Sequence, residues 1–358
     1  MSAPAKFLLA VSFLIANLLC VAAPARAEHA PKYKVRWLIG HYNLDYFEEA
    51  ARTFKASVEK GSNGDIQVEI VPAENPWGNT HGVEAPTIAL KVAKGEGEMG
   101  HSFTNVMGEL DHRLWAFDLP YLFTGYLHLE GVFEGPMGPE LLAGLQNHNL
   151  VGLAFTYSGG AQGVATTDRE IRGPEDMKGL KVGTFGSVVN NAWLTGLGAI
   201  PVTIQNQLTT IDPLTKDGAM DAAVLTWRRV HEAHLESSYK NVNIMNSTYL
   251  VSVTYINQKF LASLPKEYQA LIKHSAESAA RIERARTIEL NETTKREMMG
   301  KGMRPVFLSD EGRLKFQKAL EPVYERSLNG IVGKDLIEKL RKTPSTAKHP
   351  SGIELVGR

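Results

Sequence analysis

The stretch VRWLIGHYNLDYFEEAARTFKASVEKGSNGDIQVEI, residues 35–70, decides the fold class. Residues 35–39 predict a strand, and residues 45–60 predict a helix because apolar side chains recur there at helical spacing. The strict alternation of residues 65–70 predicts a second strand with one wet face. The apolar side chains on the helix are Phe47, Ala51, Phe54 and Val58. This strand, helix, strand order predicts a parallel or mixed sheet covered by helices.

The middle of the chain repeats the same order. Strands are predicted at 150–157, 180–182, 220–225 and 250–256, with a single helical turn at 174–178 and a helix at 190–198. An uninterrupted helical pattern then runs from Pro265 to Met299, with Ser263 as its predicted N-cap. At ~1.5 Å per residue this helix exceeds roughly 45 Å, which is longer than one small domain. We therefore expect it to cross two lobes.

Composition excludes several classes of protein. A length of 358 residues favours about two domains. The 39 basic and 39 acidic residues leave no positive excess for a nucleic-acid partner. The single cysteine excludes an internal disulfide framework and a four-cysteine metal site.

The first residues have the pattern of a secretory leader. Lys6 precedes an apolar run over residues 7–23, and Ala25-Arg26-Ala27 places small residues where a signal peptidase cleaves. We expect cleavage after Ala27 and a periplasmic location; the alternative is an uncleaved membrane anchor. Because the only cysteine, Cys20, lies in this leader, the remaining chain is predicted to be thiol-free and slightly acidic.

Six stretches taken in order resemble one family, the extracytoplasmic solute-binding proteins of tripartite ATP-independent periplasmic (TRAP) transporters of the C4-dicarboxylate-binding type. Each segment is short, and the shared order carries the resemblance. The matching segments are FKASVEK with G and IQV (residues 54–68), FDLPYLF (117–123), PEDMKGLKV (174–182), LGAIPV (197–202), GAMD (218–221), and NQKF followed by LP (257–265).

The resemblance implies a two-lobed α/β fold of the periplasmic-binding-protein type (type II). A ligand cleft would lie between the lobes and a long helix would cross both. The expected division is a leader at 1–27, a first lobe at 28–157 plus about 250–285, a second lobe at 158–249 plus about 286–340, and a mobile tail at 341–358. The implied role is a receptor that closes on a small organic solute and delivers it to small and large membrane subunits. No enzymatic activity, cofactor or nucleic-acid partner is expected, and the chain itself is not expected to span the membrane.

Three positions where the family commonly holds a substrate carboxylate are occupied here by Gly163, Gly183 and Leu225. An arginine suits such a carboxylate because its guanidinium is planar and permanently charged. Two interpretations stay open. Either the site lacks this clamp and takes a neutral, aromatic or cationic solute, or the register differs and another arginine, Arg228 or Arg229, supplies the charge.

Loops that follow the predicted strands supply the candidate cleft lining. Aromatic and amide side chains there suit a stacked, hydrogen-bonded organic solute. The candidates are Tyr42, Asn43, Trp77, Phe103, Thr104, Asn105, Tyr157, Ser158, Phe185, Asn206, Gln207 and Trp227. The alternative for Trp77, Phe103 and Trp227 is core packing, which is also the interpretation of Phe117, Tyr121 and Phe123.

Other chemistry finds little support in the sequence. His231 and His234 are spaced like metal ligands on one predicted helix, but a solvated helix face is the commoner explanation, and we predict no metal site. No nucleophile-elbow, P-loop or zinc-protease motif occurs in the sequence. A secreted enzyme or a sensor module on the same scaffold remains the alternative to a transport receptor.

Overall fold

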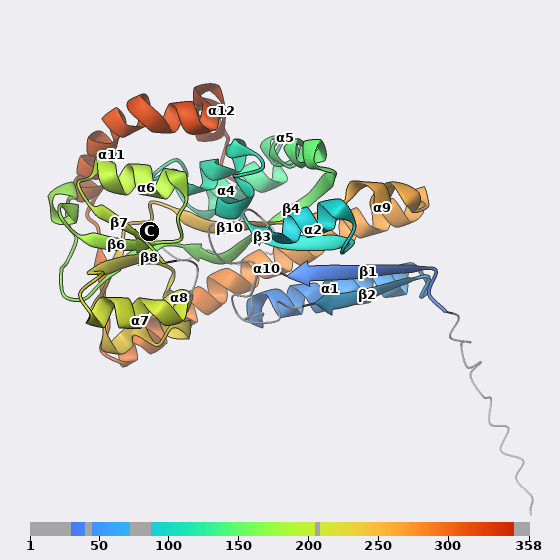
Figure 1. Ribbon diagram of the computed structural model, residues 1–358, viewed down its shortest axis with the longest axis horizontal. Coiled ribbons are helices and arrows are strands. Elements are labelled where there is room, and N and C mark those ends of the chain that lie inside the picture. The colour runs from blue at the N-terminus through green and yellow to red at the C-terminus, as the bar shows by residue number, and fades with distance from the viewer. Residues whose placement is uncertain (1–29, 40–44, 72–86, 205–207, 347–358) are drawn as a thin grey trace, which may run out of the picture.

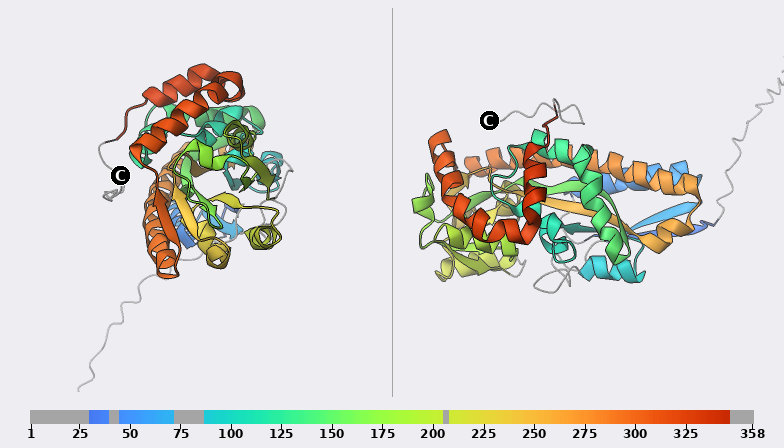
Figure 2. Two further views of the ribbon diagram at one scale, coloured as in Figure 1. Left: turned by 90° about the vertical axis from the view of Figure 1, so that its left-hand side faces the viewer. Right: turned by 90° about the horizontal axis from the view of Figure 1, so that it is seen from above.

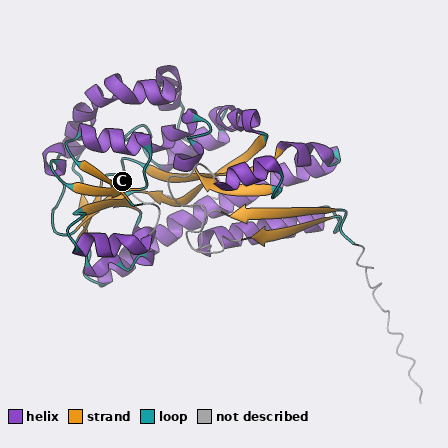
Figure 3. Cartoon of the chain, in the orientation of Figure 1, coloured by secondary structure: helices purple, strands orange, loops and turns teal. Residues whose placement is uncertain are grey.

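The strands of the protein form two separate sheets. The computed structural model describes residues 30–39, 45–71, 87–204 and 208–346. One sheet has the strand order β2-β1-β3-β10-β4 and the other β11-β9-β5-β8-β6-β7. They lie at opposite ends of the long axis (Figure 1), and helices cover them (Figure 3). This confirms the predicted two-lobed α/β fold.

The first sheet is built on the stretch that opened the sequence. β1 (Tyr33–Ile39) pairs in parallel with β2 (Ile66–Val71) and β3 (Met99–Phe103). The antiparallel strands β10 (Tyr249–Asn257) and β4 (Leu150–Ala161) extend it. Helix α1 (Asp45–Gly61) joins β1 to β2 and turns its predicted apolar stripe into the core. The predicted strand, helix, strand unit is therefore confirmed.

The second sheet consists of six strands of four residues each. β6 pairs in parallel with β7 and β8, whereas β5 pairs antiparallel with β8 and β9. The strands are β5 (Gly163–Thr166), β6 (Lys181–Thr184), β7 (Ile200–Thr203), β8 (Ala222–Leu225), β9 (Asn241–Ile244) and β11 (Arg304–Phe307). Helix α6 (Val188–Gly196) packs on one face, and α7 (Leu208–Lys216) with α8 (Trp227–Glu232) on the other.

Two strand-to-strand connections cross between the lobes. β4 continues into β5 through Gln162, and β9 returns to β10 through residues 245–248. The crossings are hydrogen-bonded to each other, because Gln162 N donates to Thr248 O at 3.0 Å. At the end of β4 the chain turns through Gly159 with φ 125°, and a Cβ there would lie 3.0 Å from Thr226 of the second lobe. Only glycine suits both that dihedral and that close approach.

Helix α10 (Lys266–Gly300) is the predicted long helix. It has 35 residues, about 52 Å at the usual rise. It packs on α1 and β4 in the first lobe and on α8 in the second, and Figure 2 shows it running from one lobe to the other. The expectation of Ser263 as its N-cap is wrong. Ser263 ends the preceding helix α9 (Gln258–Ser263), where its hydroxyl donates to Phe260 O, and Pro265 takes the cap position.

The C-terminal helices begin on α6 of the second lobe and end beside His128 of the first. α11 (Asp310–Val323), the π-helical segment η5 (Tyr324–Gly333) and α12 (Lys334–Lys342) follow β11. His128 Nε2 lies 3.0 Å from Leu340 O, and Thr346 N donates to Leu127 O. The lobe boundaries given above stay a prediction, and most of the tail, residues 347–358, lies outside the described residues.

Short helical elements fill the connections. These are α2 (Thr87–Lys94), α3 (Thr104–Met107), η1 (His112–Asp118), α4 (Tyr126–Glu134), α5 (Met137–Ala143), η2 (Gly144–His148), η3 (Pro174–Met177) and η4 (Leu235–Ser237).

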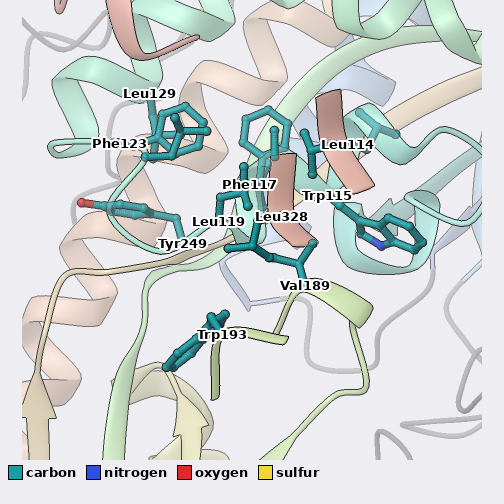
Figure 4. Close-up of a cluster of buried hydrophobic side chains, with 14 of the residues drawn as sticks. Leu114, Trp115, Phe117, Leu119, Phe123, Leu129, Val189, Trp193, Tyr249 and Leu328 are labelled. Atoms are coloured by element: carbon teal, nitrogen blue, oxygen red, sulfur yellow. The ribbon is translucent and has the colours of Figure 1, made fainter. Parts of the chain in front are cut away.

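One apolar cluster runs from the first lobe into the second. Phe117 and Leu119, at the end of η1, belong to the same cluster as Val189 and Trp193 of α6 (Figure 4). Leu328 of η5 is a buried member of the same cluster. Phe117 and Phe123 are buried, and Tyr121 packs against the cluster, so these three residues pack the core as predicted. The two lobes are therefore in direct apolar contact.

Candidate functional site

The carboxyl ends of parallel strands from both lobes meet at the junction between the lobes. β3 ends at Phe103, β6 at Thr184 and β8 at Leu225, and a helix follows each strand. The contact between Phe103 of the first lobe and Arg229 of α8 places these ends face to face. In α/β proteins, ligands bind at the carboxyl ends of such strands. The junction is therefore the candidate site.

Arg229 reaches from the second lobe to the first beside the end of β3. Its guanidinium carbon lies 5.6 Å from the centroid of the Phe103 ring, and only 4% of the residue is exposed. Thr226 caps α8 by accepting a hydrogen bond from Arg229 N at 3.2 Å. Because that cap fixes the first turn of α8, it holds Arg229 at the carboxyl end of β8.

Glu232 holds both arginines of this helix. Arg229 Nη1 donates to Glu232 Oε2 at 3.1 Å, and Arg228 Nε donates to Glu232 Oε1 at 3.0 Å. The spacings of three and four residues bring Glu232 within reach of both arginines, which are neighbours of each other along the chain. The carboxylate thereby orients two guanidinium groups beside the end of β8.

The three positions singled out by the resemblance lie together on one face of the second sheet. Gly163 pairs with Leu225, and Gly183 pairs with Ala223 on the same strand, β8. A Cβ at Gly183 would lie 2.6 Å from Met220 Sδ, and one at Gly163 would lie 2.8 Å from Asn243 O. Leu225 is fully buried in the apolar cluster that contains Met220. These positions therefore present packed apolar surface and no polar side chain.

The other predicted lining residues have different surroundings. Phe185 and Trp227 pack at the junction on the apolar cluster of the second lobe. Asn105 is mostly buried, and its Oδ1 accepts from Val106 N at 2.9 Å. Tyr157 lies in the interior, where its hydroxyl donates to Glu130 Oε1 at 2.8 Å and burial raises its pKa. Five predicted residues lie outside the described ones: Tyr42, Asn43, Trp77, Asn206 and Gln207.

A buried polar chain beside Phe103 escaped the sequence reasoning. His101 Nε2 lies 2.9 Å from both Thr156 Oγ1 and Ser252 Oγ. Ser252 Oγ lies 2.5 Å from Ser158 Oγ, at the start of the lobe crossing. The ring of Phe47 packs on the imidazole with centroids 4.0 Å apart. The alternation of side chains along a strand could have identified His101. It lies two residues before Phe103 on the same strand, so the two side chains share a face of the sheet.

The histidine pair considered as a metal site does not share a helix. α8 ends at Glu232, and His234 lies beyond it with φ 52°, so the expected common helix face is wrong. The two imidazole centroids are 6.5 Å apart. Within residues 30–39, 45–71, 87–204 and 208–346, no three histidine, cysteine, aspartate or glutamate side chains are grouped as a metal site would require.

Comparison with known proteins identifies the family. Residues 41–330 match the profile of the bacterial extracellular solute-binding proteins of family 7. A solute-binding protein of Verminephrobacter eiseniae is 25% identical over 82% of this chain and 84% of its own length. The C4-dicarboxylate-binding periplasmic protein DctP of Rhodobacter capsulatus is 24% identical over 79% of this chain and 83% of its own.

Solved structures share the fold. A TRAP periplasmic solute-binding protein from Ochrobactrum anthropi has a TM-score of 0.79 at 22% identity and covers 87% of this chain and 94% of its own. One from Shewanella oneidensis with bound succinate has a TM-score of 0.76 at 22% identity, covering 88% and 99%. In the part of the chain that the structure describes, no helix has the length and apolarity to cross a membrane. The chain therefore belongs to the bacterial extracellular solute-binding proteins of family 7, the DctP family.

Proposed function

We propose that this protein is the receptor of a TRAP transporter for an organic acid, and that Arg229 supplies the charge that holds the acid. The observation that carries the proposal is the position of Arg229, which reaches from the second lobe to Phe103 of the first. A guanidinium at such a junction contacts a solute that both lobes enclose. Its planar donors match a carboxylate in charge and in shape.

The packing around the resembling positions explains why the charge would come from a helix. Met220 fills the space in front of Gly183, and Leu225 is apolar, so β6 and β8 carry no cation there. A buried carboxylate without a cation faces several kcal/mol of desolvation, roughly. Arg229 and Arg228, both held by Glu232, stand at the end of the same β8 strand. This arrangement supports the second of the two interpretations left open by the sequence.

The names of related proteins point to the same ligand class. Structural neighbours carry succinate, D-erythronate and β-D-glucuronate, each of which has a carboxylate. A relative from Escherichia coli is named as a 2,3-diketo-L-gulonate-binding protein. For this protein we propose only the ligand class, a small organic acid, and no particular compound.

A comparison of each acid with its own amide tests the charge requirement. Calorimetry with succinate and succinamide, and with benzoate and benzamide, isolates the carboxylate from the rest of the molecule. A receptor for acids binds the acid at least about tenfold more tightly, because a charge-assisted hydrogen bond contributes about 1.5–3 kcal/mol. A thermal-shift screen with D-erythronate and β-D-glucuronate selects the acid to use; at 100 Kd a ligand adds about 2.7 kcal/mol of stability.

Arg229→Gln and Arg228→Gln form a matched pair of variants. Both remove one partner of Glu232, but only Arg229 contacts Phe103 across the junction. We expect Arg229→Gln to weaken binding of the selected acid by about tenfold to a hundredfold, and Arg228→Gln to weaken it less. Equal effects of the two variants, or none, would contradict the role of Arg229.

The second candidate is a receptor for a neutral or aromatic solute. The observation in its favour is the apolar surface formed by Met220, Leu225 and Trp227 beside the junction. Binding of benzamide as tight as that of benzoate, unchanged in Arg229→Gln, would establish it. A secreted enzyme is the remaining alternative, and NMR of the bound solute over hours distinguishes it by turnover.

Export and partners complete the proposal. We propose removal of residues 1–27, which lie outside the described residues, and delivery of the solute to small and large membrane subunits. Mass spectrometry of the protein exported by a bacterial cell should show Glu28 as its first residue. Uptake of the acid by vesicles that contain both membrane subunits should require this protein.

A further inference from the structure

A second cavity, apart from the junction, lies among the C-terminal helices. Figure 2 shows α11, η5 and α12 bending back on themselves, and Gly333 with φ 104° leads from η5 into α12, a dihedral that glycine adopts at little cost. The cavity has a volume of about 450 Å³, within the range of roughly 300–1,000 Å³ that small-molecule sites have. The described residues that line it include neither Phe103 nor Arg229. It is therefore distinct from the junction site.

Tyr121 lines this cavity in a strained conformation. Its φ is 59°, which a bulky residue adopts only where its surroundings hold it there. Tyr121 N donates to Ser247 O at 2.7 Å, and its ring centroid lies 6.4 Å from that of Phe316. Its hydroxyl is buried without a hydrogen-bond partner among the residues that the structure describes. Because strained residues of this kind are concentrated at ligand sites and switches, Tyr121 marks the cavity as a candidate binding site.

One wall of the cavity is acidic. Glu321 near the end of α11 and Glu325 near the start of η5 both line it, four residues apart. No charged nitrogen of the described residues lies within 4.0 Å of either carboxylate. Gln317, four residues before Glu321, adds an amide to the same wall. Two carboxylates without an ion-pair partner favour a ligand with a cationic group.

The wall that α12 forms is mainly basic. Lys334 and Arg341 line it, and in the described part of the chain no carboxylate oxygen lies within 4.0 Å of their charged nitrogens. The Arg341 guanidinium carbon lies 5.7 Å from the centroid of the Tyr324 ring. Glu338 also lines this wall, but it pairs at 3.9 Å with Lys342, which is not a lining residue. This wall favours an anionic group of the ligand.

We propose that this cavity is a second ligand site and that it binds an amino acid with an apolar body. The ammonium group of the amino acid contacts Glu321 and Glu325. Its carboxylate contacts Lys334 and Arg341, and its apolar body packs on the lining residue Ile337. A ligand with a single charge is attracted by one wall and repelled by the other. The proposal goes beyond the proposed function and does not depend on it.

Methyl NMR distinguishes the two sites. Ile337 lines the cavity, whereas Ile204 belongs to the apolar cluster that contains Trp227 at the junction. In the full chain with isotope-labelled isoleucine methyl groups, Ile337→Val and Ile204→Val assign the two signals. L-phenylalanine, L-leucine and 6-aminohexanoate, which differ in the distance between their charges, are the probes. At least one of them should shift the Ile337 signal in a saturable way, and the absence of any shift up to their solubility limits overturns the proposal.

Analogues that lack one charge test the need for both. Phenethylamine lacks the carboxylate of L-phenylalanine, and 3-phenylpropionate lacks its ammonium group. Titrations followed at the Ile337 methyl signal should show each analogue binding at least about tenfold more weakly than the amino acid, because one set of charge-assisted hydrogen bonds is lost. An analogue that binds there as tightly as the amino acid overturns the assignment to a zwitterion.

Variants of the two walls complete the test. Glu325→Gln and Lys334→Gln should each weaken binding of the amino acid by about tenfold, again through the loss of a charge-assisted hydrogen bond. The matched controls are Glu311→Gln on α11 and Lys339→Gln on α12, which are exposed and paired away from the cavity and should leave binding unchanged. Equal effects in wall and control variants overturn the site.

The two proposals fail in distinguishable ways. The cavity proposal fails at the Ile337 signal and leaves the acid-binding proposal intact, because neither Phe103 nor Arg229 lines the cavity. The acid-binding proposal fails at the Ile204 signal, which would then stay unchanged with the selected acid.

Discussion

Arg284 and Glu130 form a buried ion pair that fixes the long helix to the first lobe. Arg284 Nε on α10 lies 2.9 Å from Glu130 Oε1 on α4, and both side chains are almost fully buried. Arg284 also donates to the carbonyl of Phe155 at 2.8 Å and pairs with Glu134. Four polar groups that would be costly alone are satisfied together.

Arg284→Met should destabilise the protein strongly. The substitution leaves Glu130 buried without its cation, which typically costs about 3–5 kcal/mol. Arg281→Gln is the control, because Arg281 pairs with Glu134 on the partly exposed side of the same network and such pairs contribute about 1 kcal/mol or less. Urea unfolding measures both, and equal losses would contradict the distinction.

Stability should fall as the pH rises from about 4.5 to 7. Burial raises the pKa of Glu283 to about 7, so between these values the folded chain binds more protons than the unfolded chain. Stability is therefore greatest on the acidic side of this window, and up to about 3 kcal/mol is lost across it. Chemical denaturation at several pH values tests the slope, and Glu283→Gln, whose amide can still accept from Tyr157 N, should flatten it. A slope no flatter in Glu283→Gln than in the parent chain would refute this assignment.

Gly163→Ala should cost more stability than Gly183→Ala. The new methyl group at position 163 would meet a backbone oxygen, Asn243 O, which the sheet holds in place. At position 183 it would meet Met220 Sδ, an atom near the end of a flexible side chain. We expect about 1–3 kcal/mol for the first and less for the second, measured as unfolding free energies. A larger loss of stability in Gly183→Ala than in Gly163→Ala would show that the backbone at Asn243 yields more easily than the Met220 side chain.

Ser252→Ala should expose the energetic role of the chain beside Phe103. Ser252 Oγ contacts His101, Thr156 and Ser158, so its removal leaves buried polar groups with fewer partners, at about 1–3 kcal/mol. Ser263→Ala is a suitable control, because the Ser263 hydroxyl is exposed at the end of α9. A thermal melt that shows no difference between the two variants would rule out a structural role for the chain.

Periodic segments were predictable, and short ones were not. α1 and α10 are long enough for their spacing to decide their type, and both occur close to their predicted bounds. β5, β7, β9 and β11 have four residues each, too few for alternation to be read, and β9 (NVNI) mixes amides with apolar residues.

The candidate site was harder to predict for a related reason. The resemblance drew attention to Gly163, Gly183 and Leu225, and these three do lie together on adjacent strands. What Gly183 faces, however, depends on Met220, which no local pattern connects to it. Arg229 was one of two candidates in an open alternative, and only the three-dimensional position of Phe103 distinguishes it from Arg228.

A continuous helix that is packed on both lobes limits how they can move. The backbone hydrogen bonds of α10 resist stretching, so the spacing of the lobes along its axis stays nearly constant. The remaining freedom is rotation about that axis and tilt at the crossings near Gly159 and Gln162. If the junction binds the solute as proposed, a receptor hinged in this way would discriminate solutes by their width across the junction and would tolerate differences in length along the helix. Solutes that share one carboxylate end but differ in length would then be accepted more readily than solutes that differ in girth.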